Sequence, residues 1–294
     1  MTNKTALVIP TCNAGKEFEE VAKKIYDQSS RLNLVRVYDS ESNDLTVKIA
    51  ESLDFEVIKV SKKSFSHSAT RSKIAQEMYE NGFDYLIFMT QDVYLQNHAI
   101  ELLLKYIIKN SNCGVVYGKQ EIDLEKGSIN EYFARSFNYG SVSSIKTKKD
   151  VENLGIKTIF NSDAFAVYNL KLAKKVGFFG EEAVFGEDMI IADKFIQRGY
   201  GVGYCAESRV FHTHNYTLLE EFSRYKVIGQ FHKMNNEIIN RYGKTNSEGI
   251  RLAIGEIKYL ISEKKVYKIP ESLLRNAAKF FGFKLGFMRG KANV

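Results

Sequence analysis

The sequence has no tryptophan, only two prolines and three cysteines among its 294 residues, and no uninterrupted apolar run of the roughly 18 residues that a membrane span needs. Cys12, Cys113 and Cys205 are odd in number and far apart, which argues against a disulfide framework and against a zinc site. The first apolar run stops at Pro10. We therefore expect neither a signal peptide nor a spanning helix and place the chain in the cytoplasm.

The composition is typical of a folded, enzyme-sized globular protein, with 44% apolar residues, 17 tyrosines and 20 phenylalanines. Its excess of positive charge, formally +7, lies in one segment. Residues 257–294 carry nine basic and two acidic side chains, whereas the rest of the chain holds equal numbers of each sign. This distribution favours a basic tail and disfavours a nucleic-acid groove across the core, so no nucleic-acid partner is expected.

Short apolar runs alternate with helical patterns through the first 110 residues. The runs predict strands over 6–10, 34–39, 55–60 and 85–90, and the patterns between and after them predict helices over 16–28, 44–53, 68–81 and 97–110. This order predicts a parallel sheet covered by helices on both faces. Ligands of such sheets bind at the carboxyl ends of the strands, so the loops there are where function is sought.

The remainder of the chain is less regular. Strands are predicted near 114–118, 158–168, 201–205 and 209–212, and a helix over 188–197. The stretch 120–150 mixes charge, glycine and serine and is predicted to be a long connection that contributes to a site or a lid. From residue 217 onward the pattern is mainly helical.

Two common nucleotide-binding motifs are missing from the first strand-to-helix turn, VIPTCNAGKEF. A Walker A loop would require glycine at position 10 and serine or threonine at position 17, where the chain has Pro10 and Glu17. A dinucleotide-binding turn requires three glycines, and only Gly15 is present. Phosphate-loop, nicotinamide and flavin chemistry are therefore disfavoured.

Acidic residues occupy the predicted strand ends. Asp39 closes the second strand and Asp92 follows the fourth. A carboxylate at this edge of a sheet can hold a divalent cation, which would neutralise a diphosphate leaving group such as that of a nucleotide sugar. The alternative is that both are ordinary turn or cap residues.

Further candidates stand at two predicted helix starts and in the last strand. Asp188 follows Gly186 and Glu187 at the start of an amphipathic helix, where it is either a functional carboxylate or only the helix cap. His67 and Arg71 are four residues apart and would share a helix face. The arginine could pair with diphosphate or be an ordinary surface residue. His212 and His214 could point to one side of a strand and ligate a metal or contact phosphate, or make ordinary polar contacts.

The order of these motifs along the chain resembles a known family. VIPTCNAGK, VYDSESND, FSHSATRS, FMTQDV and VGFFGEEAVFGED, in this order, resemble the nucleotide-sugar glycosyltransferases of family 2, which have the GT-A fold. The additional segments RSFNYGS, LGIKTIF and HTHNYT resemble the bacterial O-antigen rhamnosyltransferases, which use dTDP-L-rhamnose. The resemblance runs from Ala6 to at least Tyr225.

The resemblance implies an α/β protein of the GT-A class, with a Rossmann-like, mostly parallel sheet flanked by helices and a helical C-terminal extension. Residues 1–215 would form the catalytic domain that binds nucleotide sugar and acceptor. Residues 216–294 would form a helical region with a basic amphipathic tail.

The resemblance also implies roles for individual residues. Asp188 would be the general base, and Asp92 would bind Mg²⁺ or Mn²⁺, with His212 as a possible second ligand. Asp163 and Glu187 would line the acceptor pocket. The nucleotide sugar would be bound by residues from the first four strand ends, namely Pro10, Thr11, Asn13, Asp39, Ser40, His67, Arg71, Gln91 and Asp92.

Three positions depart from the family pattern. Gln91 precedes Asp92, so metal binding would depend on a single carboxylate. Ser72 follows Arg71 and Asp163 stands before Ala164, where asparagine would be expected at both positions. The second change adds an acid to the expected acceptor pocket.

The expected reaction is the inverting transfer of L-rhamnose from dTDP-L-rhamnose to a hydroxyl of a lipid-linked saccharide during synthesis of a bacterial surface polysaccharide. Another nucleotide sugar as donor is an alternative, and a noncatalytic sugar-binding or assembly protein is another. The three carboxylates Asp39, Asp92 and Asp188 argue against the last.

The tail suggests where the enzyme works. Its apolar residues form one helical stripe with basic residues on the other side, a pattern that suits a helix lying on an anionic membrane. This stripe comprises Leu274, Ala277, Phe281, Leu285 and Met288. We expect peripheral association with the inner face of the cytoplasmic membrane. The alternative is a helix docked on the protein's own core.

Overall fold

The computed structural model describes residues 3–62, 67–123, 125–180, 185–243 and 246–290. The chain divides into two compact units. The first comprises residues 1–121, 140–149 and 159–212, and the second comprises residues 122–139, 150–158 and 213–294. Two segments before residue 159 therefore belong to the same unit as the C-terminal helices, which the sequence pattern did not indicate.

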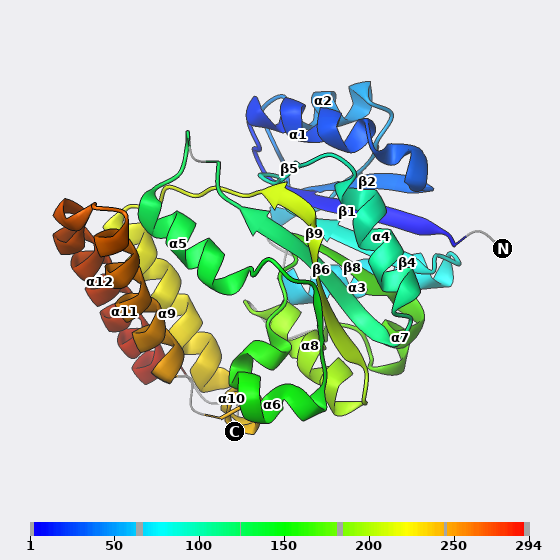
Figure 1. Cartoon of the computed structure of the whole chain (residues 1–294). Coiled ribbons are helices and arrows are strands. Elements are labelled where there is room, and N and C mark those ends of the chain that lie inside the picture. The colour runs from blue at the N-terminus through cyan, green and yellow to red at the C-terminus, as the bar shows by residue number, and fades with distance from the viewer. Residues whose placement is uncertain (1–2, 63–66, 124, 181–184, 244–245, 291–294) are drawn as a thin grey trace. The chain divides into compact units, whose positions relative to one another are not determined.

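The first unit is built on a nine-stranded sheet, and its first half follows the predicted order closely (Figure 1). Four parallel strands are connected by helices, and their order in the sheet is β3-β2-β1-β4. The strands are β1 (Thr5–Thr11), β2 (Leu34–Asp39), β3 (Glu56–Lys59) and β4 (Tyr85–Met89), and the connecting helices are α1 (Glu17–Tyr26), α2 (Thr46–Ser52) and α3 (His67–Glu80).

The second half of the sheet is mixed rather than parallel. β8 runs antiparallel to both β4 and β6, whereas β6 and β9 are parallel. The strands are β5 (Tyr94–Leu95), β6 (Cys113–Glu121), β7 (Ser144–Lys146), β8 (Phe165–Asn169) and β9 (Gly201–Phe211), and the helices are α4 (Ala99–Lys109), α7 (Leu170–Lys175) and α8 (Glu187–Gln197). The expected pair of strands over 201–212 is one strand, in which a register shift lies opposite Gly118 and Lys119. The strand expected over 158–168 begins only at Phe165.

The sheet is buried on both faces, as its apolar strands predict. On one face, Leu7, Ile9 and Ile87 pack with α1 and α4 side chains such as Phe18 and Ile100. On the other face, Phe88 and Tyr168 pack against Phe179, and Tyr168 also contacts Phe195 of α8. Burial of this kind contributes about 1.5–3 kcal/mol for each large apolar side chain and fixes the strand ends relative to one another.

The second unit is mainly helical. Its helices are α5 (Ile129–Asn138), α6 (Val151–Leu154), α9 (Leu218–Met234), α10 (Asn236–Arg241), α11 (Asn246–Ser262) and α12 (Ile269–Arg289). The prediction of a long connection over 120–150 is wrong, because α5 begins after the Ser128 cap and β7 follows this helix. Short 3-10 turns occur in both units, at Ser29–Arg31, Lys148–Asp150, Gly155–Ile159 and Val266–Lys268.

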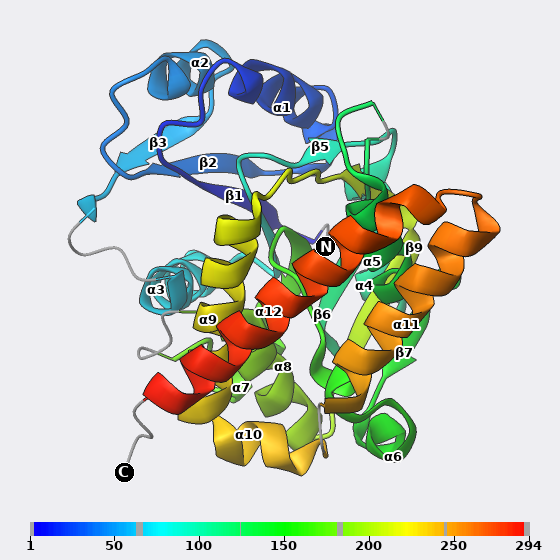
Figure 2. The same ribbon diagram turned by 90° about the vertical axis from the view of Figure 1, so that its left-hand side faces the viewer.

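The longest helix of the second unit, α12, packs closely along α9 in the same direction (Figure 2). Gly282 and Gly286 are buried, and a Cβ atom on either would collide with the backbone carbonyl of Phe222 or Lys226. Gly229 of α9 has the reciprocal relation to Phe283. Glycine is thus required where the two backbones touch. Within the described residues, no helix has the length and apolar character that crossing a membrane would require.

Candidate active site

The loops after β1 and β2 are tied together at the strand ends by side-chain hydrogen bonds. Asp39 is almost fully buried, and its Oδ1 accepts hydrogen bonds from Thr11 Oγ1 at 2.9 Å and Ser42 Oγ at 2.6 Å. Its Oδ2 accepts from the Ser42 backbone N–H at 2.9 Å. Asn13, in the left-handed region with φ of +46°, donates its N–H to Ser42 Oγ at 2.7 Å. Asp39 therefore organises this corner, with lone-pair capacity left for one more donor.

The same corner is joined to the end of β4. The Cys12 N–H donates to Gln91 Oε1 at 2.8 Å, so the residue before Asp92 contacts the loop that Asp39 organises. The Ser40 N–H donates to the Thr11 carbonyl at 2.8 Å, and Pro10 pairs with Tyr38 in the β1–β2 ladder. The predicted nucleotide-binding residues of the first, second and fourth strand ends are thus brought together.

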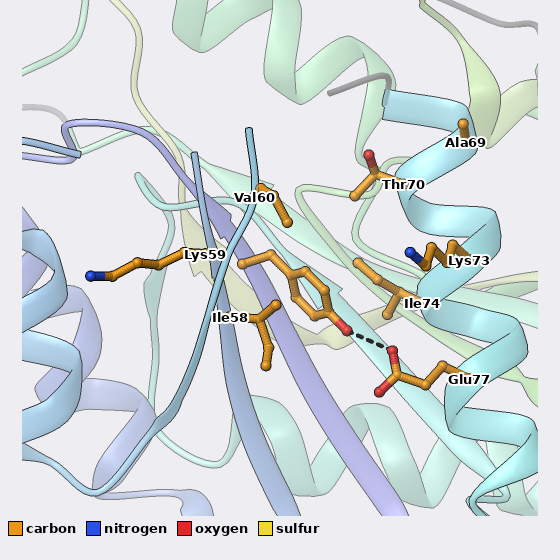
Figure 3. Close-up of a pocket in the computed structure, with 9 residues that line it drawn as sticks. Ile58, Lys59, Val60, Ala69, Thr70, Lys73, Ile74 and Glu77 are labelled. Atoms are coloured by element: carbon orange, nitrogen blue, oxygen red, sulfur yellow. Dashed lines mark hydrogen bonds between the residues drawn. The ribbon is translucent and has the colours of Figure 1, made fainter. Parts of the chain in front are cut away.

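A cavity of about 380 Å³ lies between β2, β3 and α3 (Figure 3). Tyr38 enters it, and its hydroxyl donates to Glu77 at 3.0 Å. The remaining lining residues are Ile58, Lys59, Val60, Ala69, Thr70, Lys73 and Ile74. Tyr38 and Asp39 are consecutive in β2 and so point to opposite faces of the sheet. The cavity is therefore separate from the hydrogen-bond network around Asp39.

Asp92 and His212 form an acid–imidazole pair at the end of the sheet. His212 Nε2 lies 3.4 Å from Asp92 Oδ2, and His212 Nδ1 lies 2.9 Å from Gln120 Oε1. The amide of Gln120 donates through Nε2 to Ser162 Oγ at 2.8 Å, which leaves its Oε1 as the acceptor. With the amide in this orientation, Nδ1 carries the hydrogen and Nε2 faces the carboxylate.

These donors fit a divalent cation. Half-exposed Asp92 offers a hard oxygen, and the buried imidazole of His212 presents Nε2 beside it while its other nitrogen donates to an amide. A hydrogen bond on the far side of a histidine ring is the usual arrangement at metal sites, because it fixes the tautomer and the ring orientation. His214, the other histidine of the predicted pair, belongs to the second unit, where its ring stacks on Tyr216.

A second cluster lies where the starts of α3, β8 and α8 meet in the first unit. Arg71 is buried, with Nε 3.0 Å from Asp163 Oδ2 and Nη1 hydrogen-bonded to Glu187 Oε1. The Tyr168 hydroxyl donates to Asp163 Oδ1, and Asn161 Nδ2 donates to the Tyr168 oxygen at 2.8 Å. The guanidinium also lies 5.5 Å from the centre of the Phe88 ring. This set is called the Arg71 cluster below.

Asp188 stands at the first turn of α8, beside the Arg71 cluster. Gly186 precedes the helix with φ of +75°, a left-handed conformation that glycine adopts without strain. Glu187 is turned inward to Arg71 and is buried, whereas Asp188 keeps part of its surface exposed and accepts the Met189 N–H at 2.8 Å. The cap position of α8 is Gly186, with no side-chain cap hydrogen bond, so the interpretation of Asp188 as only the helix cap is wrong. Its role as a functional carboxylate stays a prediction.

The carboxylates of this region repel one another. Burial, followed by the charges of Glu187 and Asp163, raises the pKa of Asp188 well above its usual value. Burial also raises the pKa of Asp163 to about 6, although the Arg71 charge opposes this shift. A carboxylate with a raised pKa is a stronger base than a free one, which is the property that proton removal near neutral pH requires.

A backbone contact links the two groups of acids. Thr90 donates its N–H to the Ala164 carbonyl at 3.2 Å, which places the residue after Asp163 against the segment that leads into Gln91 and Asp92. The side chain of His67, the first residue of α3, lies outside the described part of the structure. Sequence reasoning missed Gln120, Tyr168 and Asn161. Each lies in or beside an apolar strand, where nothing in the local pattern separates a functional polar group from a core residue.

Acids at the carboxyl edge of an α/β sheet, together with the acids at the start of α8, fit the GT-A glycosyltransferases that the sequence resembles. The model of glycosyl transferase family 2 matches residues 6–177. The chain belongs to this family, and it is an enzyme that transfers glycosyl groups. The predicted family and fold class are therefore confirmed.

The relatives narrow the class further. The chain is 38% identical over 285 residues to the O-antigen chain rhamnosyltransferase WbaN of Salmonella anatum. The aligned residues cover 95% of this chain and 88% of the relative. The fold is similar to that of a mannosyltransferase from Pyrobaculum calidifontis solved with GDP-Man and Mn²⁺, with a TM-score of 0.58, 13% identity, and 96% and 87% of the two chains covered. It is also similar to S. aureus TarS 1–349, with a TM-score of 0.56, 14% identity, and 97% and 90% covered.

Proposed function

We propose that this protein is an inverting rhamnosyltransferase that moves L-rhamnose from dTDP-L-rhamnose to a hydroxyl of a lipid-linked saccharide in O-antigen synthesis. The observation that carries the proposal is the 38% identity to a curated O-antigen chain rhamnosyltransferase over nearly the whole chain. It is supported by the acids at the sheet edge, which supply the two functions that sugar transfer needs.

The first function is to stabilise the leaving diphosphate. We assign Asp92 and His212 as the residues that would hold Mg²⁺ or Mn²⁺, because they present oxygen and nitrogen donors 3.4 Å apart. When bound, such a cation neutralises charge on the diphosphate as its bond to the sugar breaks. The fold relative solved with Mn²⁺ supports this assignment.

The second function is to remove a proton from the acceptor. The acceptor oxygen attacks the anomeric carbon from the side opposite the diphosphate, the bond between that carbon and the diphosphate oxygen breaks, and Asp188 takes the hydroxyl proton. dTDP leaves with the electron pair of the broken bond, and the anomeric configuration inverts. A positioned carboxylate typically accelerates such a step about 10²–10⁴-fold.

The nucleotide is assigned to the corner organised by Asp39. Thr11, Asn13 and Ser40 line the same strand ends, and the remaining lone pair of Asp39 suits an N–H of the base. The resemblance also assigns Arg71 to the nucleotide. Its contacts with Asp163 and Glu187 favour a different role, which is to position acidic side chains.

A donor panel tests the proposed function. Purified protein is given dTDP-L-rhamnose, dTDP-D-glucose, UDP-N-acetylglucosamine and GDP-mannose, each with Mn²⁺ and a lipid-diphosphate saccharide, and release of the nucleotide diphosphate is measured. We expect turnover with dTDP-L-rhamnose above all others. Preference for another donor would show that rhamnose is not the transferred sugar, whereas the assignment as a glycosyltransferase would stand. Binding of nucleotide sugar without turnover of any donor or acceptor tested would favour a noncatalytic sugar-binding protein.

Membrane association is proposed from the exposed face of α12. The predicted stripe is largely exposed, because the helix docks on α9 through Gly282 and Gly286 instead. Leu274, Phe281 and Met288 of the stripe are 56%, 61% and 72% exposed. The helix therefore both docks on protein and presents an apolar face, so the two alternatives for the tail are compatible. Basic residues beside the apolar face suit an anionic bilayer on which a lipid-linked acceptor would reside.

A further inference from the structure

The Arg71 cluster contains more negative than positive charge in a buried place. Asp163 and Glu187 both contact the single guanidinium, and Asp188 follows Glu187 directly in the first turn of α8. Within the described residues, three carboxylates therefore share one cation. A buried carboxylate without compensation is costly, so removing the cation or one acid must change how strongly the others hold a proton.

The geometry gives Arg71 two fixed partners in different elements. Its Nε faces Asp163, just before β8, and its Nη1 faces Glu187 at the start of α8. The side chain is 5% exposed, and the centre of the Phe88 ring lies 5.5 Å from the guanidinium carbon. An arginine held this way has its planar fork committed to two carboxylates and acts as a bracket between the strand and the helix.

Asp163 is itself held in place. Tyr168, within β8, donates its hydroxyl to Oδ1 of Asp163, and Asn161 donates to the Tyr168 oxygen. Both carboxylate oxygens of Asp163 thus have a partner, one phenolic and one cationic. An asparagine here would keep the size of the side chain but lose its negative charge.

From these contacts we infer that Arg71 is a positioning residue for the base Asp188, which it holds through Glu187, and that Asp163 is the counter-charge that retains Arg71 in this bracket instead of at the nucleotide. The inference rests on the proposed function only in taking Asp188 as the base. It assigns a role to the acid that departs from the family pattern.

The groups that face Asp188 determine the direction of each effect. They are Glu187 on its own helix, Asp163 before β8, Tyr168 in β8 and Arg71 in α3. Asp188 must be deprotonated to act as a base, so turnover falls as pH drops through its pKa. Loss of a neighbouring negative charge lowers that pKa, and loss of the cation raises it.

The first experiment measures kcat against pH at saturating donor. We expect the acid limb of Asp163→Asn to move to lower pH by about one unit and that of Arg71→Met to move to higher pH by a similar amount. Arg71→Lys keeps the charge but cannot bridge two carboxylates with a planar fork, so kcat should fall about tenfold or more while the acid limb stays near that of the wild type. A purely structural role would lower activity equally at every pH.

Measuring dTDP binding distinguishes a positioning role of Arg71 from a direct contact with the nucleotide. We expect Asp163→Asn and Arg71→Lys to bind dTDP within about twofold of the wild type by calorimetry, whereas loss of a charged contact with diphosphate would weaken binding about tenfold or more. Weaker dTDP binding with an unmoved acid limb would overturn the inference and return Arg71 to the nucleotide. Arg36→Met is the matched control, because Arg36 is also a buried arginine held by two glutamates, Glu56 and Glu77. It should lower the unfolding temperature without moving the acid limb.

A measurement without substrate covers the case in which no donor is turned over or Arg71→Met fails to fold. The raised pKa of Asp163 means that its contribution to stability is greatest below pH 3.8 and is lost as pH rises toward about 6. Thermal unfolding of the protein without nucleotide should therefore depend less on pH between 4 and 6 in Asp163→Asn. If wild type shows no turnover but this difference appears, the charge sharing stands and the proposed function fails. Parallel unfolding curves would overturn the charge sharing itself.

Discussion

Asp188, the proposed proton acceptor, is a partly exposed residue whose pKa is raised by burial of its carboxyl group and by neighbouring acids. At the residue scale, the proposed function depends on a few side chains whose charges are coupled. The helix start after Gly186 directs Glu187 inward and leaves Asp188 accessible, so two consecutive acids have different surroundings. The same division of roles is found at the end of β4, where Gln91 binds the Cys12 backbone and Asp92 faces His212.

Replacing Asp188 by asparagine keeps the shape of the side chain and removes its basicity. We expect Asp188→Asn to lower turnover about 10²–10⁴-fold while dTDP binding stays within about twofold of the wild type. Asp193→Asn, a change to a buried acid on the same helix, serves as the control and should alter kcat by less than about twofold. Nucleotide release and calorimetry on both variants check this, and comparable turnover by Asp188→Asn would remove the base assignment.

Gln120 offers a test of the metal site that leaves its ligands intact. Its Oε1 accepts from His212 Nδ1, so Gln120→Leu removes the contact that orients the imidazole. We expect the Mn²⁺ concentration for half-maximal activity to rise about 10–100-fold, the usual effect of losing such an outer contact. Gln96→Leu, which loses a contact with Glu121, is the control. The same apparent Mn²⁺ affinity in Gln120→Leu would show that His212 is not a ligand.

At the scale of elements, the antiparallel β8 brings its beginning, rather than its end, to the edge where β4 ends. Met89 pairs with Phe165, so Asp163 lies near the level of Gln91. Sequence reasoning that looks for function at the ends of parallel strands does not find such a residue. In the second unit, α9 and α12 approach each other at glycines, where the two backbones touch.

The glycine contact predicts opposite effects of the same substitution at two helical sites. Gly286→Ala places a methyl group against the Lys226 carbonyl and should destabilise the second unit by about 1–3 kcal/mol. Gly249 of α11 has open space around it, so Gly249→Ala should stabilise by up to about 1 kcal/mol through helix propensity alone. Urea unfolding followed by circular dichroism distinguishes the two. Equal effects would mean that the helices do not approach as closely as described.

His232 of α9, whose ring packs on α12, predicts that the stability of the second unit falls in acid. Burial lowers the pKa of His232 to about 4 from 6.5, and its ring packs edge-on against Phe283. The stability that this neutral ring contributes is present above pH 6.5 and is lost as pH falls toward 4. We expect His232→Phe to reduce the loss of stability over this range by about 1–3 kcal/mol. Denaturant unfolding at pH 7, 5.5 and 4.5 measures it, and an unchanged pH dependence would contradict it.

At the scale of the whole molecule, the sequence predicted the first half of the sheet almost residue for residue, because β1 to β4 are parallel strands with short apolar runs and helices between them. It was less successful from residue 120 onward. There α5 and β7 lie in a stretch rich in charge and glycine, and β8 reverses the direction of the sheet. The candidate acids were identified by their positions, but the pairing of Arg71 with Asp163 joins residues 92 positions apart, and no local pattern reveals such a contact.

The uneven charge of the chain predicts that it associates with anionic vesicles and that this association depends on salt. Vesicles rich in phosphatidylglycerol should sediment with the protein at low salt, and binding should weaken severalfold when salt rises from 50 to 500 mM, because surface charges are then screened. Phe281→Ser with Met288→Ser should weaken binding about tenfold. Val142→Ser, a change at an equally exposed apolar residue of the first unit, is the control and should leave binding unchanged. Indifference of the wild type to anionic vesicles would refute membrane association.

The glycine contact between α9 and α12 also limits how the end of this chain can be altered. Gly282 and Gly286 are spaced to match Phe222 and Lys226, sixty residues earlier in the chain, so the two segments are constrained to vary together. A designer who replaces α12 by a different amphipathic helix would have to reproduce that spacing. The outward-facing phenylalanines, in contrast, could be exchanged without regard to α9.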